Sequence, residues 1–360
     1  MVWLKGMARA LVLASFGVVV SGCSHLHLTQ QPDQVITRTG TYDDYANRTP
    51  AGPAAARVLP YAILAEQTYE PRVYSDRRAF AVDRTCIEDD PAGCGGLGAD
   101  KQRAKRLLDD WRYVWSCQGP VDCRIKTVGT KTNGAASLPS GLSPVDGLGV
   151  QIWVRRGAVC REAVVAFRGT VKDDTGDWIS NLHWVTRFLP YYDQYDQVRD
   201  YIGGIVTHIT SDPCYRARTT TIIAIGHSLG GGLAQLAAYA DGDIRQVYTF
   251  DPSFVTGYYS TGLRNRDANV IGLRSERIYE HGEILAYGRY IVRQFNPPTA
   301  CDPRIVNLRF DVLHGSVISQ HGLTPFTTAL LRAARHYRPE PDPVIMQPCS
   351  EGGPPTAAAF

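Results

Sequence analysis

The chain lacks three features that would mark other classes of protein: an apolar run long enough to span a membrane, a large excess of charge of one sign, and a Cys-x-x-Cys pair. A transmembrane helix needs about 20 apolar residues, and the N-terminal apolar run covers only residues 10–20. Lys plus Arg number 38 against 35 for Asp plus Glu, with no basic stripe among aromatics, so we expect no nucleic-acid partner. The cysteine spacings do not match a zinc finger, so we expect no metal site.

The N-terminus has the layout of an export signal. Lys5 and Arg9 precede the apolar run, and Val-Ser-Gly-Cys follows at residues 20–23. This tetrapeptide resembles the lipobox of bacterial lipoproteins, which implies acylation of Cys23 and an anchor of two or more acyl chains. We therefore expect a lipid-anchored protein of the bacterial cell envelope, facing the periplasm or the cell surface. The alternative is an ordinary cleaved signal in which Cys23 has no role.

Eight cysteines remain after Cys23, an even number in a chain that we expect to leave the cytoplasm. This pattern predicts disulfides, with the pairing left open. The eight cysteines are Cys86, Cys94, Cys117, Cys123, Cys160, Cys214, Cys301 and Cys349.

Composition along the chain predicts one folded domain with extensions. We expect a signal peptide at 1–22, a lipidated N-terminus and polar tether at 23–53, and a Pro-rich tail at 339–360. The folded body is expected at 54–338, with a cysteine-rich insertion at about 83–123.

Short apolar segments alternate with segments of helical periodicity in the body. The strands are expected at 150–154, 163–167, 221–225, 247–250, 277–279 and 305–312. The helices are expected at 59–69, 101–115, 195–209, 231–240 and 325–334. This alternation predicts an α/β fold with a mostly parallel central sheet covered by helices on both faces.

Residues 226–230 read Gly-His-Ser-Leu-Gly, between an expected strand and an expected helix. This is the context of a nucleophile elbow, a strained turn that lifts the Ser228 hydroxyl above the sheet. The amide of Leu229 at the helix N-terminus is suited to bind a developing oxyanion. A second amide should come from the turn after strand 163–167, where Thr170 follows Gly169.

Three motifs resemble the class-three, fungal-lipase-like lipases: Phe-Arg-Gly-Thr at 167–170, Asp-Trp-Ile-Ser-Asn-Leu at 177–182 and the motif at 226–231. The resemblance covers about 163–331. It implies an α/β-hydrolase fold, a triad of serine, acid and histidine, and a mobile lid. By the same resemblance, Thr170 is the oxyanion residue and Asp177 braces its loop, although Asp177 also fits a surface cap.

The general base should follow the last strand, where His314 and His321 both lie. His321 is preferred because it directly precedes a helix, as the histidine region of the resembling family does, and His314 is the alternative. His227 adjoins the serine and is expected to pack rather than react. The aromatic-rich segment 182–195 fits a lid or acyl-binding wall, or ordinary core aromatics.

The acid should lie between Ser228 and His321, just past a strand end. Glu283 is preferred because it follows the later strand, where the resembling family has an aspartate. Asp251 is the alternative acid, and Glu280 ranks third.

Together, these residues predict a serine hydrolase that cleaves carboxylic esters of lipids, of the triacylglycerol lipase or phospholipase A type, without a cofactor. A short-chain esterase or thioesterase is the first alternative. A catalytically inactive envelope lipoprotein that binds through the same fold is the second.

Overall fold

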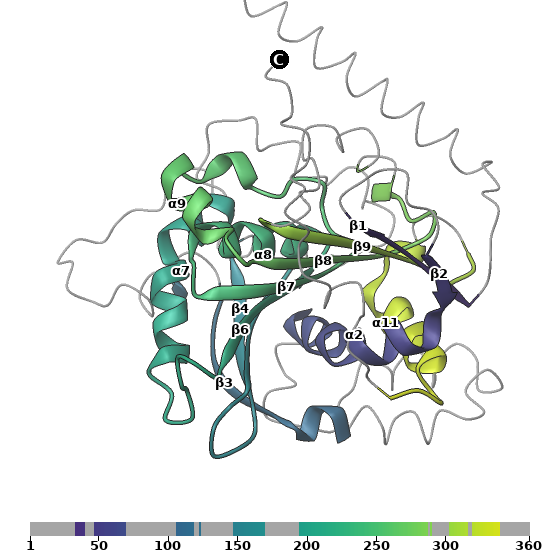
Figure 1. The fold of residues 1–360 in the computed structure, drawn as a ribbon, viewed down its shortest axis with the longest axis horizontal. Coiled ribbons are helices and arrows are strands. Elements are labelled where there is room, and N and C mark those ends of the chain that lie inside the picture. Colours follow the sequence, from purple (N-terminus) through teal and green to yellow (C-terminus); the bar gives the residue numbers. More distant parts are fainter. Residues whose placement is uncertain are drawn as a thin grey trace, which may run out of the picture.

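A computed structural model describes residues 33–39, 47–69, 106–118, 122–123, 147–169, 194–286, 289, 302–315 and 319–338. These residues form a mixed α/β structure around one large sheet (Figure 1). Within the described residues, no helix combines the length and the apolar character needed to cross a membrane.

The sheet has nine strands in the order β2-β1-β9-β8-β7-β6-β5-β4-β3. The strands are β1 (Gln34–Thr39), β2 (Asn47–Pro50), β3 (Trp111–Gln118), β4 (Gly149–Arg155), β5 (Glu162–Phe167), β6 (Thr221–His227), β7 (Ile244–Phe250), β8 (Arg274–Glu280) and β9 (Arg304–Asp311). Strands β5 to β9 pair in parallel, whereas β1, β2, β3 and β4 pair with their neighbours antiparallel. The parallel arrangement that we expected therefore holds for the centre of the sheet and not for its two margins.

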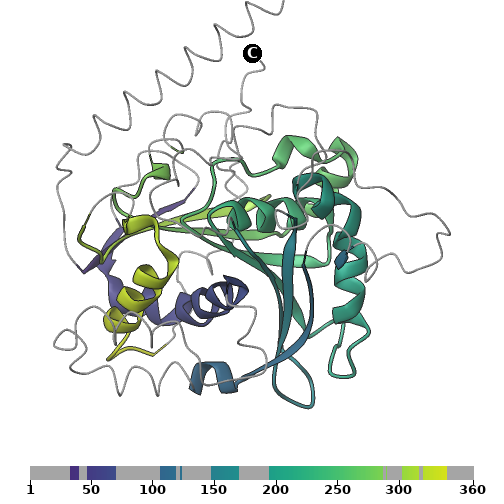
Figure 2. The same cartoon turned by 180° about the vertical axis from the view of Figure 1, so that it is seen from behind.

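Helices cover both faces of this sheet, as expected. On one face, α2 (Ala51–Glu66) and α11 (Leu323–Ala333) pack against each other and against the sheet. On the other, α7 (Gln194–Thr210) and α8 (Leu229–Ala240) pack on β4 to β7, and α9 (Leu263–Asn269) lies beside α8. Figures 1 and 2 show the two layers from opposite sides. The short elements are η1 (Gln67–Tyr69), η2 (Tyr258–Ser260) and η4 (Ser319–His321).

Local sequence explains the elements nearest the nucleophile motif. Strand β6 is buried on both faces and is correspondingly apolar along most of its length. Helix α8 follows with glycine, alanine and leucine, whose small or aliphatic side chains let it approach the sheet closely. The six strands and the helices expected around 195–209, 231–240 and 325–334 are confirmed, with shifts of a few residues at their ends.

The folded body begins earlier than the predicted boundary at residue 54. Strands β1 and β2 and the start of α2 lie within the segment 23–53 that we predicted as a tether. Val35 and Ile36 are buried, and the backbone of β1 pairs with β9 along its whole length. The polar side chains around them give no apolar pattern in the sequence, and β1 is held in place by backbone pairing with both β2 and β9.

The predicted helix at 101–115 is wrong in its second half. Among the described residues of this range, 106–109 are helical, and Trp111–Gln118 forms β3, which pairs with β4. Aromatic and β-branched side chains favour a strand here, and pairing with β4 outweighs the apparent helical spacing.

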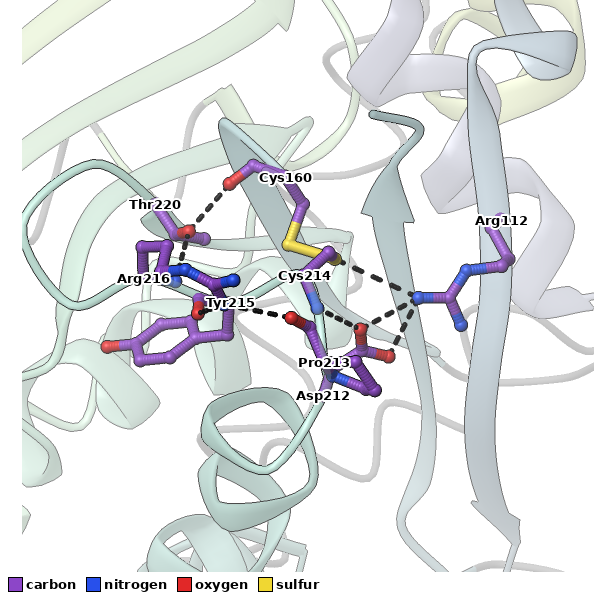
Figure 3. The surroundings of a disulfide bond; sticks show 8 residues. All are labelled: Arg112, Cys160, Asp212, Pro213, Cys214, Tyr215, Arg216 and Thr220. Atoms are coloured by element: carbon purple, nitrogen blue, oxygen red, sulfur yellow. Dashed lines mark hydrogen bonds and ion pairs between the residues drawn. A yellow bond between two sulfur atoms is a disulfide. The ribbon is translucent and has the colours of Figure 1, made fainter. Parts of the chain in front are cut away.

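Two disulfides lie in the described residues and confirm the prediction for four cysteines. Cys117 bonds to Cys123, and Cys160, just before β5, bonds to Cys214, just after α7. Figure 3 shows Arg112 of β3 beside the second bond, where its guanidinium donates to the Asp212 carboxylate at 2.8 and 2.9 Å. Cys86, Cys94, Cys301 and Cys349 lie outside the described residues, as do Cys23, the segment 1–22 and the tail at 339–360.

Candidate active site

Ser228 occupies a strained turn between β6 and α8. Its φ of 55° lies in the left-handed region, which is uncommon for a residue other than glycine. The Ser228 amide donates to the Phe250 carbonyl at 3.0 Å, and its own carbonyl accepts from Ser253 at 2.8 Å. A Cβ at Gly230 would clash with the Phe167 carbonyl oxygen, so this glycine permits the close approach of helix and sheet. The turn thus has the strained geometry and the strand-to-helix position that a nucleophile elbow requires.

His321 links the Ser228 hydroxyl to the Glu283 carboxylate. Its Nε2 lies 3.0 Å from Ser228 Oγ, and its Nδ1 lies 2.7 Å from Glu283 Oε2. A carboxylate can only accept, so Nδ1 carries a proton, and Nε2 is the ring nitrogen that faces the serine hydroxyl. Ser228, His321 and Glu283, the candidate nucleophile, base and acid, are therefore joined in one hydrogen-bonded series.

Glu283 is fully buried but has partners that stabilise its charge. Oε1 pairs with the Arg289 guanidinium, and Oε2 also accepts from the Leu285 amide at 2.8 Å. Burial alone would raise the pKa of Glu283, but Arg289, His321 and the Leu285 amide outweigh it and lower the pKa below its usual value. Arg289 also donates to the Pro252 carbonyl at 2.7 Å, which ties this cation to the segment after β7. Sequence reasoning missed Arg289, because no motif marks it.

Asp251, the alternative acid, lies close to the same histidine. One of its carboxylate oxygens is within 4.8 Å of ring nitrogens of His227 and His321. Oδ1 accepts from the Glu280 amide at 2.9 Å, whereas Oδ2 is buried without a hydrogen-bond partner among the described residues. Burial and the neighbouring Glu283 charge raise the pKa of Asp251 well above its usual value. The raised pKa favours the protonated, neutral form of Asp251, whereas the lowered pKa of Glu283 favours its charged form.

The remaining candidates occupy other positions. His314 is exposed in the segment after β9, and His321 rather than His314 makes the bond to Ser228. The Glu280 carboxylate accepts from the amides of Val312 and Leu313, and burial raises its pKa to about 9.

Leu229 is the first residue of α8, and the first amides of a helix have no partner inside the helix.

Several predicted features fall outside the described residues. These are Thr170, Asp177, Trp178 and almost all of the aromatic-rich segment 182–195.

His227 does not merely pack, as the sequence led us to expect. Its Nδ1 lies 3.0 Å from the Tyr69 hydroxyl, and its Nε2 lies 2.8 Å from the His321 carbonyl oxygen. Both ring nitrogens of His227 and of His321 are therefore engaged in hydrogen bonds, which leaves the cluster of His227, Asp251 and His321 poorly suited to hold a metal ion.

Comparison with known proteins points to the same region of the chain. A family model described as a Tle-like phospholipase domain matches residues 137–269. The chain contains a region similar to a phospholipase domain. The matched region holds Ser228, Leu229 and Asp251 and ends before Glu283 and His321, and it spans well under half of the chain.

Lipase II from Rhizopus niveus is a similar solved structure, with 16% identity over 65% of this chain and 78% of that chain. Its TM-score is 0.32, at which the likeness carries no structural argument. No curated protein matches the chain.

Proposed function

We propose that this protein is a serine hydrolase that cleaves carboxylic esters of lipids through an acyl-enzyme on Ser228. The observation that carries the proposal is the pair of hydrogen bonds that joins Ser228, His321 and Glu283. His321 lies 3.0 Å from the Ser228 hydroxyl oxygen and 2.7 Å from a Glu283 carboxylate oxygen, and Ser228 occupies a strained turn. An inactive binding protein would have no need for this arrangement.

The first half of the reaction acylates the serine. Ser228 Oγ attacks the ester carbonyl carbon while His321 Nε2 takes the hydroxyl proton, and Glu283 stabilises the imidazolium that forms. The carbonyl oxygen becomes an oxyanion, which the Leu229 amide and the positive end of α8 stabilise. Thr170 would supply the second amide. The imidazolium then protonates the leaving alcohol oxygen as the carbon–oxygen bond of the ester breaks.

The second half releases the acid. Water attacks the acyl carbon as His321 Nε2 accepts its proton, and the same proton returns to Ser228 Oγ as the acyl–serine bond breaks. The free carboxylic acid leaves and the site returns to its starting state. No cofactor takes part in either half.

Two observations support lipid esters as the substrate class. The match to a phospholipase domain covers the elbow, and the sequence motifs resemble the class-three lipases. Both favour a phospholipid or a triacylglycerol over a short soluble ester. Strand β6, the elbow and α8, together with the order serine, acid and histidine along the chain, support an α/β-hydrolase scaffold for this activity.

A panel of substrates tests this function. Phospholipid micelles, triacylglycerol emulsions and short p-nitrophenyl esters would each be incubated with the wild type and with Ser228→Ala, and released acid would be measured. We expect release from the long-chain lipids, lowered by about six orders of magnitude in the variant. Turnover of short esters alone would favour the esterase alternative, and equal turnover by the variant would rule out Ser228.

We further propose that the protein is exported and anchored in the bacterial envelope through acyl chains on Cys23. The sequence around residues 20–23 and the two disulfides, which persist in oxidising compartments, support this placement. Mass spectrometry of the mature protein from a bacterial host should find an acylated N-terminal Cys23. A mature N-terminus elsewhere, without acyl chains, would contradict the proposal.

A further inference from the structure

Four residues from four parts of the chain form a second hydrogen-bonded chain behind the candidate triad. The Gly169 amide donates to the Tyr69 hydroxyl oxygen at 3.1 Å, and that hydroxyl lies 3.0 Å from His227 Nδ1. On the other side of the ring, His227 Nε2 lies 2.8 Å from the carbonyl oxygen of His321. This series of contacts spans the turn after β5, the elbow and the base.

The direction of each hydrogen bond follows from the last acceptor in this series, the His321 carbonyl. The His321 carbonyl can only accept, so His227 Nε2 carries a proton. Burial and the neighbouring His321 lower the pKa of His227 to about 3, so the ring is neutral and Nδ1 has no proton. Nδ1 therefore accepts from the Tyr69 hydroxyl, which leaves the hydroxyl oxygen to accept from Gly169. A longer contact of 3.4 Å joins the same hydroxyl to the His227 carbonyl oxygen.

Tyr69 reaches this position from a firmly held element. It ends η1, directly after α2, and the Gln67 carbonyl of that turn accepts from Gln151 of β4 at 2.8 Å. Gly169 is packed so closely that a Cβ there would clash with the Tyr69 hydroxyl and the His227 carbonyl oxygen. The turn after β5 can approach the elbow only because this residue is glycine.

From this geometry we infer that Tyr69 and His227 are positioning residues, which hold the turn after β5 and the backbone of His321 at fixed distances from Ser228. The inference rests on the proposed function, because it assigns the two residues a purpose in that reaction. Neither touches the reacting atoms. Tyr69 sets the turn that leads to Thr170, and His227 sets the main chain that carries the base.

Positioning of this kind acts on the rate of the chemical step. Acylation needs the histidine nitrogen, the serine oxygen and the oxyanion donors to be aligned at the same moment, and a displacement of about 1 Å can cost about a hundredfold in rate. Substrate binding depends on other surfaces. Loss of the second hydrogen-bonded chain should therefore lower kcat and leave KM nearly unchanged.

Tyr69→Phe is the first test, because it keeps the ring and removes the hydroxyl that joins Gly169 to His227. We expect kcat on a lipid ester to fall about 10- to 100-fold with little change in KM. Tyr61→Phe is the matched control: it removes a hydroxyl from the preceding helix, where Tyr61 donates to Glu162 at 3.1 Å, away from the elbow. The control should keep the wild-type kcat. Wild-type kcat in Tyr69→Phe would overturn the inference.

A second variant tests whether Tyr69 and His227 act through the bond that joins them. His227→Gln keeps an amide that can donate to the His321 carbonyl but loses the bond to Tyr69. Since both variants break the same bond, the double variant should be no slower than the slower single variant. Independent, multiplying losses would show that the two side chains act separately and would contradict the inference.

Nitrogen NMR of the histidine rings supplies a readout that does not depend on activity. His227 should carry its proton on Nε2 and stay neutral at about pH 5, below the ordinary histidine pKa of about 6.5. A protonated ring at this pH, or a proton on Nδ1, would contradict the hydrogen-bonded chain itself. If the wild type shows no turnover that depends on Ser228, the proposed function fails. If the wild type is active and Tyr69→Phe is equally active, the proposed function stands and the positioning inference fails.

Discussion

The ends of β7 and β8 each place a buried carboxyl beside His321, but the two carboxyls differ in their surroundings. Glu283 has a cation, an amide and an imidazole N–H around its two oxygens, and these partners lower its pKa. Within the part of the chain that the structure describes, one Asp251 oxygen accepts from an amide and the other has no partner, and the pKa of Asp251 is raised. Both carboxyls are buried and close to the histidine, so the opposite directions of their pKa shifts follow from their different partners.

The same comparison explains why both carboxyls can coexist. Two charges in one buried site would repel each other strongly, and a pair of neighbouring acids avoids this when one of them keeps its proton. Arg289 joins the two strand ends, because it pairs with Glu283 and donates to the Pro252 carbonyl next to Asp251. The division of charge is therefore built into the loops that follow β7 and β8.

Replacing the charged member of this pair should have the largest effect. Glu283→Gln keeps the size of the side chain but no longer stabilises the imidazolium, so we expect turnover to fall by about four orders of magnitude. Steady-state kinetics on a lipid ester, with a thermal unfolding scan to show that the variant folds, would measure this. Near-normal turnover would mean that Glu283 is not the acid.

Replacing the neutral member should change turnover far less. An asparagine resembles a protonated aspartic acid and can still accept from the Glu280 amide, so Asp251→Asn should keep turnover within about tenfold of the wild type. The same kinetic assay measures it. A loss comparable to that expected for Glu283→Gln would invert the two assignments.

The stability of Asp251→Asn should depend on pH in a defined direction. A raised pKa means that the folded state holds the proton more tightly than the unfolded chain. Asp251 therefore makes its full contribution to folding stability below its ordinary pKa of about 3.9. This contribution is lost as the pH rises toward the pKa of Asp251 in the folded state. The variant does not titrate there, so its unfolding temperature should exceed that of the wild type at neutral pH and approach it near pH 4. A variant that is less stable at neutral pH would contradict a neutral Asp251.

The elbow and the order of the candidate residues could be predicted from the sequence because their signals are local. A strand, a glycine-bounded serine and a helix of small residues lie within 20 residues, and strand ends confine the acid and base. Glu283 follows β8 and His321 follows β9, and their roles stay predictions, whereas Thr170 is outside the described residues.

Tyr69 and Arg289 could not be predicted, because their importance comes from contacts between distant segments. Tyr69 follows a helix far from the elbow in sequence, and no motif surrounds it. For the same reason β1 was missed, since its polar residues are held by pairing with β9 rather than by an apolar pattern of their own. His227 is buried, and its hydrogen bonds to Tyr69 and His321 could not be predicted because these partners are distant in the sequence.

The most direct test of the whole arrangement is the rate at which a fluorophosphonate labels the serine in three proteins. The wild type, Asp251→Asn and Glu283→Gln would be labelled side by side, and the modified residue would be located by mass spectrometry. We expect modification at Ser228, at similar rates in the wild type and Asp251→Asn, and much more slowly in Glu283→Gln. Labelling at another residue, or slow labelling in Asp251→Asn with normal labelling in Glu283→Gln, would contradict the assignment of Ser228, His321 and Glu283.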